Sequence, residues 1–213
     1  MSELIRVDLH VHSSASFDCA VSPEHVVSRC RRLGLSPVFL TDHNSIEGAM
    51  QLQSTERVIA GEEVMTTGGE LIGLFLREQV PAGLGAREAA IRIKDQGGLV
   101  YLEHPYDPFR RHLSEDSIEA IADLIDIVEV FNGRSEEKVN RRAEDLCAAL
   151  GAAPGAGSDA HSTQELGGVY IEMEDFDGAE DFLVKLAAGR IVKRRAKWLL
   201  MAEAKLRPKI RRP

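Results

Sequence analysis

The sequence lacks the paired cysteines that a disulfide framework or a zinc knuckle requires. Its three cysteines, Cys19, Cys30 and Cys147, are odd in number, lie far apart and form no C-x-x-C pair. The N-terminal region also lacks an apolar stretch long enough for a signal peptide or a membrane span. We therefore expect a protein of a reducing cytoplasm that is neither secreted nor inserted in a membrane.

Basic residues are scarce outside the C-terminal end of the chain. Residues 1–192 hold 17 Lys and Arg against 33 Asp and Glu, a formal charge of −16, whereas residues 193–213 hold nine Lys and Arg against one acid. Because phosphate backbones attract clustered Lys and Arg, an acidic body disfavours broad nucleic-acid binding without excluding it. We interpret the tail chiefly as a solvated end or a cap on the acidic body, with an anionic partner as the alternative.

The chain shows no internal repeat and no low-complexity segment, and 213 residues with 44% hydrophobic content fit one core. We predict one domain over residues 1–192 and a basic tail, helical in part, over residues 193–213. Short apolar runs alternate with longer amphipathic stretches, which is typical of βα units. The predicted strands are Ile5–Leu9, Pro37–Thr41, Arg57–Ala60, Leu71–Leu76, Leu99–Leu102, Ile125–Phe131 and Ala153–Gly157. The predicted helices are Pro23–Leu33, Ser45–Leu52, Ala86–Gln96, Ser114–Leu124, Glu136–Leu150 and Ala179–Ala188.

Side chains that bind metals recur where these predicted strands end. In D-L-H-V-H, His10 and His12 are two residues apart, so both imidazoles point to the same face of an extended strand. Adjacent Glu62 and Glu63 point in opposite directions, so only one of them should face a site. The remaining strand-end clusters are T-D-H (41–43), E-H-P (103–105), E-V-F-N-G-R (129–134) and G-S-D-A-H (157–161), and Glu70 directly precedes the predicted strand Leu71–Leu76.

For each cluster taken alone, an ordinary polar turn is about as good an explanation as a metal site. Six of them at six strand ends favour a shared site, because the C-terminal ends of parallel barrel strands meet at one mouth, where such enzymes place their active sites. His25 lies within a predicted helix and His112 within a loop, and we interpret both as surface residues.

The motifs H-x-H, T-D-H, G-x-E, H-P and S-D-A-H, in this order, resemble those of the PHP family, which is named for polymerase and histidinol phosphatase domains. The match covers residues 6–172. The resemblance implies an α/β fold, a distorted (β/α)7 TIM-like barrel with the metal site at the C-terminal ends of its strands. It also implies two or three divalent ions, zinc, manganese or iron. Carried over position by position, the implied ligands are His10, His12, Asp18, His43, Glu63, Glu70, His104, Asp159 and His161.

Two of these positions have special features. Glu63 would bridge two ions. Glu70 stands where many relatives present a histidine, and its oxygen ligand would shift the preference of the site toward harder metals. Such a site should attract phosphate, because the positive charge of three divalent ions exceeds the negative charge of the four carboxylates. We therefore expect a phosphoesterase that hydrolyses a small phosphomonoester by a metal-activated hydroxide.

Two residues outside the ligand set are candidates for catalysis. Arg134 could clamp the phosphate bidentately, although a surface arginine in a turn explains it equally well. Asp42 could hold His43 in its ligating orientation or protonate the leaving group. Arg110 and Arg111 follow a ligand strand and could bind the rest of an anionic substrate.

Three other functions compete with this one. A phosphodiesterase or exonuclease acting on nucleotides would need a basic groove, which only Arg110, Arg111, Arg134 and the tail could supply. An amidohydrolase is disfavoured because a candidate bridging lysine is missing. A non-catalytic metal-binding domain is disfavoured by the nearly complete ligand set. The sequence identifies neither the substrate nor the oligomeric state, since selectivity depends on loop shape.

Overall fold

The computed structural model describes residues 4–193, and the predicted basic tail from residue 194 onward lies outside the described residues. The predicted boundary between the domain and the tail is therefore not tested and stays a prediction. The fold is α/β, as expected. The elements in chain order are β1 (Ile5–Val7), α1 (Pro23–Arg32), β2 (Val38–His43), α2 (Glu47–Leu52), β3 (Val58–Thr66), β4 (Gly69–Leu74), α3 (Ala86–Asp95), β5 (Leu99–Leu102), α4 (Glu115–Ala120), β6 (Ile127–Asn132), α5 (Glu137–Leu150), β7 (Ala153–Gly157), β8 (Val169–Met173), α6 (Gly178–Ala187) and β9 (Arg190–Lys193).

Local sequence explains where several helices begin and end. Ser22 accepts a hydrogen bond from the backbone N–H of His25 at the start of α1, and Pro23 occupies the first turn. Ser114 caps α4 in the same way. The helix α5 ends at Gly151, whose φ of 66° is a left-handed conformation that glycine adopts without steric cost.

The main sheet has six strands in the order β2-β3-β4-β5-β6-β7. The pairs β2–β3, β5–β6 and β6–β7 are parallel, but β4 runs antiparallel to both of its neighbours. The expectation of uniform βα units is wrong at this point, because a tight turn at residues 67–68 joins β3 directly to β4. As a result, β4 begins at the end of the sheet where the parallel strands finish.

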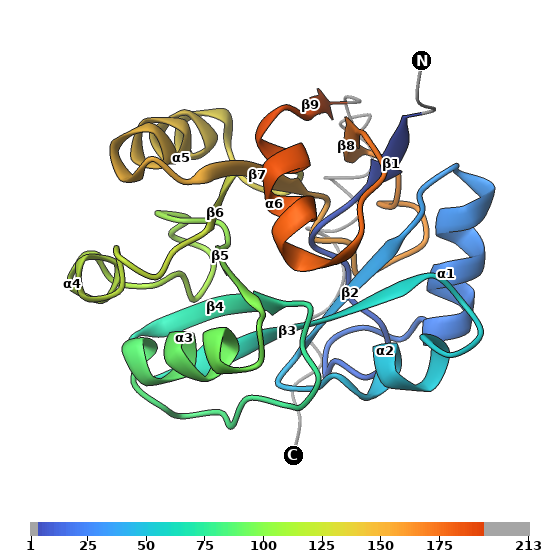
Figure 1. Ribbon diagram of the computed structural model, residues 1–213, viewed down its shortest axis with the longest axis horizontal. Helices are drawn as coiled ribbons and strands as arrows, with labels where there is room; N and C mark the ends of the chain where they lie inside the picture. The colour runs from blue at the N-terminus through green and yellow to red at the C-terminus, as the bar shows by residue number, and fades with distance from the viewer. Residues whose placement is uncertain (1–3, 194–213) are drawn as a thin grey trace.

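This sheet curls into a half-barrel, with α1 to α5 around its outside (Figure 1). The segment 8–12 lies between its two edge strands. Leu9 N donates to Ala156 O at 3.3 Å, and Thr41 N donates to Val11 O at 2.9 Å. A complete seven-unit barrel is not confirmed. A separate antiparallel sheet, β1-β8-β9, includes two strands that the sequence analysis did not predict.

The interior of the half-barrel is divided into an apolar end and a polar end. Phe39, Leu99, Ile127 and Phe182 belong to one buried cluster, in which α6 packs against the N-terminal ends of the parallel strands. Figure 1 shows α6 lying across this part of the sheet. The opposite end is therefore the only end of these parallel strands left to form a mouth.

The three cysteines are free and buried, in agreement with the expectation that they form no disulfide. Among residues 4–193, no helix combines the length and the apolar character that crossing a bilayer requires. The cytoplasmic location stays a prediction.

Candidate metal centre

The nine predicted ligands come together at the mouth of the half-barrel. Seven of them line a pocket of about 370 Å³, and His10 and His12 lie buried beneath it. The carboxyl ends of β2, β3, β5 and β7 contribute most of the set. Glu70 joins it from the first residues of β4, because that strand is antiparallel.

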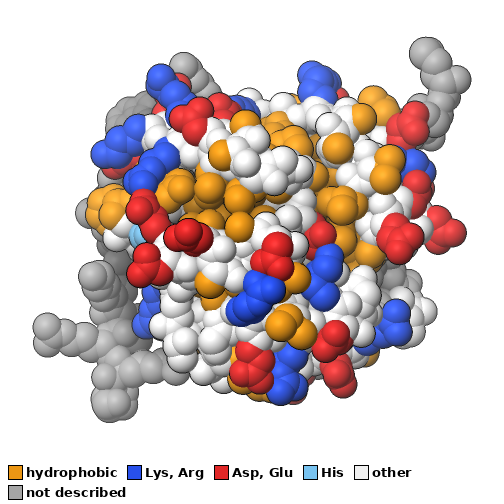
Figure 2. All heavy atoms as spheres, turned by 60° about the vertical axis from the view of Figure 1, so that its left-hand side comes forward, with side chains coloured by type: hydrophobic (Ala, Val, Ile, Leu, Met, Phe, Trp, Pro, Cys, Tyr) orange, Lys and Arg blue, Asp and Glu red, His pale blue; other side chains and the backbone are white. Residues whose placement is uncertain are grey.

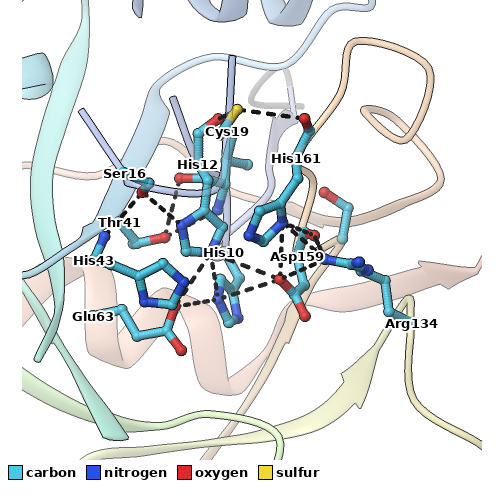
Figure 3. A network of polar contacts seen from close by, with 12 residues as sticks. His10, His12, Ser16, Cys19, Thr41, His43, Glu63, Arg134, Asp159 and His161 are labelled. Atoms are coloured by element: carbon cyan, nitrogen blue, oxygen red, sulfur yellow. Dashed lines mark hydrogen bonds and ion pairs between the residues drawn. The ribbon is translucent and has the colours of Figure 1, made fainter. Parts of the chain in front are cut away.

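The innermost group consists of His10, His12, Glu63 and Asp159 (Figure 3). The two Nε2 atoms of the histidines lie 3.1 Å apart, and each is 3.2 Å from Oε2 of Glu63. Asp159 Oδ1 is 3.9 Å from Nε2 of His10 and 3.7 Å from Nε2 of His12. Two imidazole nitrogens at this separation need a proton or a cation between them, since their lone pairs repel. Two nitrogen and two oxygen donors fit a divalent transition metal.

A second group forms on the other side of Glu63. Oε1 of Glu63 lies 3.1 Å from Nε2 of His104, while Oε2 of Glu63 faces the two inner histidines. Glu70 Oε1 lies 3.7 Å from Nδ1 of His43, and that buried nitrogen has no hydrogen-bond partner among the described residues. Oε1 of Glu63 thus faces His104, whereas Oε2 faces His10, His12 and, at 3.4 Å, Nδ1 of His43, so the two oxygens lie against different histidines.

A third group lies nearer the solvent. Asp18 Oδ2 is 3.1 Å from Nε2 of His161 and 3.5 Å from Nε2 of His43. The ring of His12 stacks between the rings of these two histidines, at centroid distances of 4.6 Å to His43 and 4.2 Å to His161. His12, His43 and His161 together offer three nitrogens that could hold an ion.

Burial at the mouth is compensated by opposite charge. Burial acts to lower the pKa of His10, but the carboxylates of Glu129, Asp159 and Glu63 outweigh it and hold that pKa well above its ordinary value. The pKa of Glu63 is held well below its ordinary value despite burial, mainly by His10. Burial and the neighbouring Glu63 raise the pKa of Glu70 to about 7. The donor set is thus one that a bound cation would neutralise.

Glu129, which the sequence analysis did not select, organises the floor of the site. Its carboxylate accepts hydrogen bonds from Tyr101 Oη at 3.0 Å, Asn132 Nδ2 at 2.9 Å and the backbone N–H of His104 at 2.8 Å. It also lies 3.1 Å from Nδ1 of His10. A proton held there leaves Nε2 of His10 free to bind a cation. A glutamate inside the apolar run I-V-E-V-F was the signal available in the sequence.

Asp42 lies behind the donor groups and does not line the pocket. It is 1% exposed, and its oxygens accept hydrogen bonds from Ser13 and Ser16. Ser16 Oγ in turn lies 3.1 Å from Nδ1 of His12 and accepts the backbone N–H of His43. This geometry favours positioning of His12 over proton donation to a leaving group.

The arginines differ in how strongly they are engaged. Arg110 is bound by two carboxylates, Asp159 at 2.7 Å and Asp107 at 2.8 Å. Arg134 Nη1 lies 2.9 Å from Nδ1 of His161 and donates to the carbonyl oxygen of Asp159 at 3.3 Å. Nε of Arg134 is 3.8 Å from Oε1 of Glu165, and the side chain is 34% exposed at the pocket. Arg111 is exposed and contacts Met65 Sδ. Arg134 and Arg111 therefore have donors available for a ligand.

The two other histidines lie outside these groups. His25 is exposed and its Nδ1 atom is 3.3 Å from Oγ of the capping Ser22. His112 Nδ1 lies 2.8 Å from the carbonyl oxygen of Asp107. Among residues 4–193, neither belongs to a group of donors that could hold an ion.

Backbone strain and close packing are concentrated beside the donors. His104 and Asp159 have φ values of 28° and 53°, which side-chain-bearing residues adopt at an energetic cost of about 1–3 kcal/mol. A Cβ atom on Gly157 would lie 2.2 Å from Cβ of His10 and 2.7 Å from Oε1 of Glu129. Glycine at this position is what lets His10 approach the strand.

Two family models and a protein of similar sequence match this chain. Residues 8–60 match the PHP domain family and residues 137–191 match the PHP-associated family. The uncharacterised protein MJ0417 of Methanocaldococcus jannaschii is 36% identical over 179 residues, which cover 81% of this chain and 72% of that protein.

Two solved structures show the same fold at low sequence identity. A two-domain protein of Bacteroides vulgatus containing a predicted PHP-like metal-dependent phosphoesterase has a TM-score of 0.74 at 16% identity, over 91% of this chain. The match spans 66% of that solved chain. The lesion-specific endonuclease EndoQ of Pyrococcus furiosus has a TM-score of 0.66 at 16% identity, over 89% of this chain and 58% of that one.

Proposed function

The chain belongs to the PHP family, and we propose that it is a metal-dependent phosphoesterase that hydrolyses a small phosphomonoester. The observation that carries this proposal is the convergence of nine His, Asp and Glu side chains at one pocket that arginines also line. The pocket volume of about 370 Å³ lies in the range of small-molecule sites.

The three donor groups would hold two or three divalent ions. In this proposal His10, His12 and Asp159 would hold an inner ion, His104 would hold a second, and Glu63 would contribute to both. Glu70, which groups with Glu63 and His43, would add a carboxylate oxygen to the second. Asp18, His43 and His161 would hold the third. Bound ions would supply Lewis acidity and lower the pKa of a water molecule to about 7 in favourable cases. Zinc, manganese and iron all fit these donors, and Glu70 biases the second position toward the harder ones.

The arginines would bind and orient the phosphate. Nη1 of Arg134 contacts His161 and the carbonyl oxygen of Asp159, and Nε faces Glu165, which leaves the N–H groups of Nη2 for phosphate oxygens. Arg111, at the rim, would contact the outer part of an anionic substrate. Arg110 contributes less charge, because Asp107 and Asp159 already neutralise it.

Buried carboxylates would fix the donors before the substrate arrives. Glu129 holds the ring of His10 and the backbone of His104, and Asp42 acts on His12 through Ser16. Pre-organised donors need no rearrangement during the reaction, which is how such positioning lowers a barrier.

Cleavage of a phosphodiester is the second candidate, and the likeness to an endonuclease fold favours it. The charge distribution opposes it. Residues 1–192 carry a formal charge of −16. On the face drawn in Figure 2, Lys and Arg side chains are interspersed with Asp and Glu rather than joined into a basic track. A small monoester therefore fits this part of the chain better than a long polyanion.

Hydrolysis of p-nitrophenyl phosphate and of its bis ester, with added manganese or zinc, tests the proposal. We expect the monoester to be cleaved faster, and the activity to be lost in His10→Ala. Faster cleavage of the bis ester would favour the diesterase. Cleavage of neither ester by metal-loaded protein would contradict the proposal and favour an amidohydrolase or a non-catalytic domain.

A further inference from the structure

The carboxylate of Glu103 is fully buried next to the ligand His104, and none of the donor groups includes it. Glu103 is 0% exposed, and neither of its oxygens has a hydrogen-bond partner among the described residues. Glu129, which is buried to the same degree, accepts three hydrogen bonds from protein groups. A buried carboxylate without partners lowers the stability of a fold, so its retention indicates a role in binding.

The pairing of β4 with β5 shows where this carboxylate lies. Tyr101 of β5 pairs with Ile72 of β4, and both side chains belong to the buried cluster inside the half-barrel. Side chains two residues apart along a strand share a face. Glu103 follows Tyr101 by two residues and Glu70 precedes Ile72 by two, so both carboxylates extend this inner face toward the mouth.

Glu103 lies close enough to other carboxylates for their charges to act on it. Burial is the first cause that raises the pKa of Glu103 well above its ordinary value, and the charges of Glu63 and Glu70 raise it further. Three carboxylates thus converge from three strands beside His104. A cation among them would compensate the repulsion between them.

The other buried atoms without partners gather around the same group of donors. Within residues 4–193, the unpartnered buried side-chain atoms belong to His43, Glu103 and His104, with one exception, Oε1 of Glu62. By contrast, both ring nitrogens of His10 contact polar side chains. The surroundings of the second donor group are therefore the part of the mouth that its own side chains satisfy least.

Glu103 is not positioned for a direct bond to an ion. It belongs to none of the groups whose donor atoms lie within 4.8 Å of one another. Its action on an ion in the second group is therefore through charge and through water. Manganese and magnesium favour carboxylate and water oxygens, whereas imidazole nitrogens suit zinc.

We propose that Glu103 is a positioning residue for the ion of the second donor group and biases this position toward manganese over zinc. Its charge adds to those of Glu63 and Glu70, and its two oxygens accept hydrogen bonds from water around the ion. The inference rests on the ion binding in the proposed function and does not depend on which ester is cleaved. It predicts two effects of opposite sign when the oxygens are removed.

Glu103→Met tests both effects, because it keeps about the length of the side chain and removes both oxygens. In the full chain stripped of ions by a chelator, the melting temperature should rise by about 2–8 °C, since a buried polar group without partners is gone. Manganese affinity, measured by competition with a chromogenic chelator, should fall about 10- to 100-fold. Zinc affinity should fall less. Glu103→Gln keeps the shape and removes the charge, and it should lower manganese affinity in the same direction.

Two variants serve as controls. Glu62 is also 0% exposed, but its Oε2 accepts the backbone N–H of Val80. Glu62→Gln keeps an oxygen for this bond and should leave manganese affinity unchanged. Val184 is 73% exposed on α6, and Val184→Ala should change neither the affinity nor the melting temperature.

The outcomes separate this inference from the proposed function. Wild-type protein that binds neither manganese nor zinc would contradict both. Ions bound by the wild type and, with equal affinity, by both Glu103 variants would overturn only the inference. So would a Glu103→Met protein that melts below the wild type without ions or does not fold, because Glu103 would then be a structural residue. Equal losses of manganese and zinc affinity would overturn the proposed preference for manganese.

Discussion

The two ends of the curled sheet are built from opposite kinds of side chain. At the closed end the rings of Phe39, Phe75, Phe176 and Phe182 pack together, with centroids of neighbouring rings 4.8–5.9 Å apart. At the mouth, histidines and carboxylates are buried just as deeply. Burial stabilises the first end by itself, whereas the second is tolerated only because opposite charges, or a cation, compensate it. The apolar packing that stabilises the fold thus lies at one end of the sheet, and the candidate site lies at the other.

Replacing Glu63, the proposed bridging carboxylate, should have the largest effect on the mouth. Glu63→Gln removes a negative charge that two donor groups share, and we expect a loss of activity of at least about 1,000-fold, equivalent to several kcal/mol of charge stabilisation. Phosphatase kinetics and metal content measure it. Because the closed end is untouched, a variant that unfolds instead of losing metal would contradict the division between the two ends.

Removing a ring from the closed end should have the complementary effect. Phe182 is fully buried in the aromatic cluster, and Phe182→Ala should lower the free energy of unfolding by about 3–5 kcal/mol. Urea unfolding measures this loss. At temperatures where the variant is folded, its metal content should equal that of the wild type. Loss of metal from a folded Phe182→Ala protein would show that the ends are coupled.

A change beneath the donors should have an intermediate effect. Glu129→Gln keeps the shape of the side chain but removes the charge that faces His10 Nδ1, and metal affinity should fall about 10- to 100-fold. Competition with a chromogenic chelator measures the affinity. Val184→Ala provides a matched surface control. An affinity equal to that of the wild type would mean that Glu129 has only a structural role.

Chelation should give the smallest and most local change. Removal of bound ions leaves the donors without compensation, so amide hydrogen exchange should accelerate in residues 8–12 and 157–161 while α6 and β8 keep their protection. Mass spectrometry of peptides resolves the two ends. Uniform acceleration over the whole chain would contradict a local role for the ions.

Much of the fold could be predicted from the sequence. The strands Leu99–Leu102 and Ala153–Gly157 have the predicted bounds, because apolar runs between turn residues define them well. The direction of β4 could not be predicted, since an apolar run carries no information on strand direction. The strands β8 and β9 were missed. β9 is four residues long and exposed at both ends, so its apolar signal is weak. β8 is buried at four of its five positions, and its short apolar run V-Y-I was a signal that the sequence offered.

The candidate site, like the fold, could be predicted from the sequence only in part. Polar residues that follow the parallel strands come together at the mouth in the structure. The argument that only one of Glu62 and Glu63 faces the mouth agrees with the structure, where Glu62 accepts the backbone N–H of Val80 instead. Supporting residues were harder to find. Glu129 contacts His10 across 119 positions of sequence, and the link from Asp42 to His12 passes through Ser16. Contacts of this kind depend on tertiary packing, which local patterns do not encode.

The most direct test of the account is the metal content of the full chain purified without chelator, measured by elemental analysis. The account predicts two to three divalent ions per chain in the wild type and in Phe182→Ala, and a lower number in Glu63→Gln. Wild-type protein that takes up no divalent ion, even when incubated with manganese or zinc, would contradict the central claim that the buried charges of the mouth exist to hold metal.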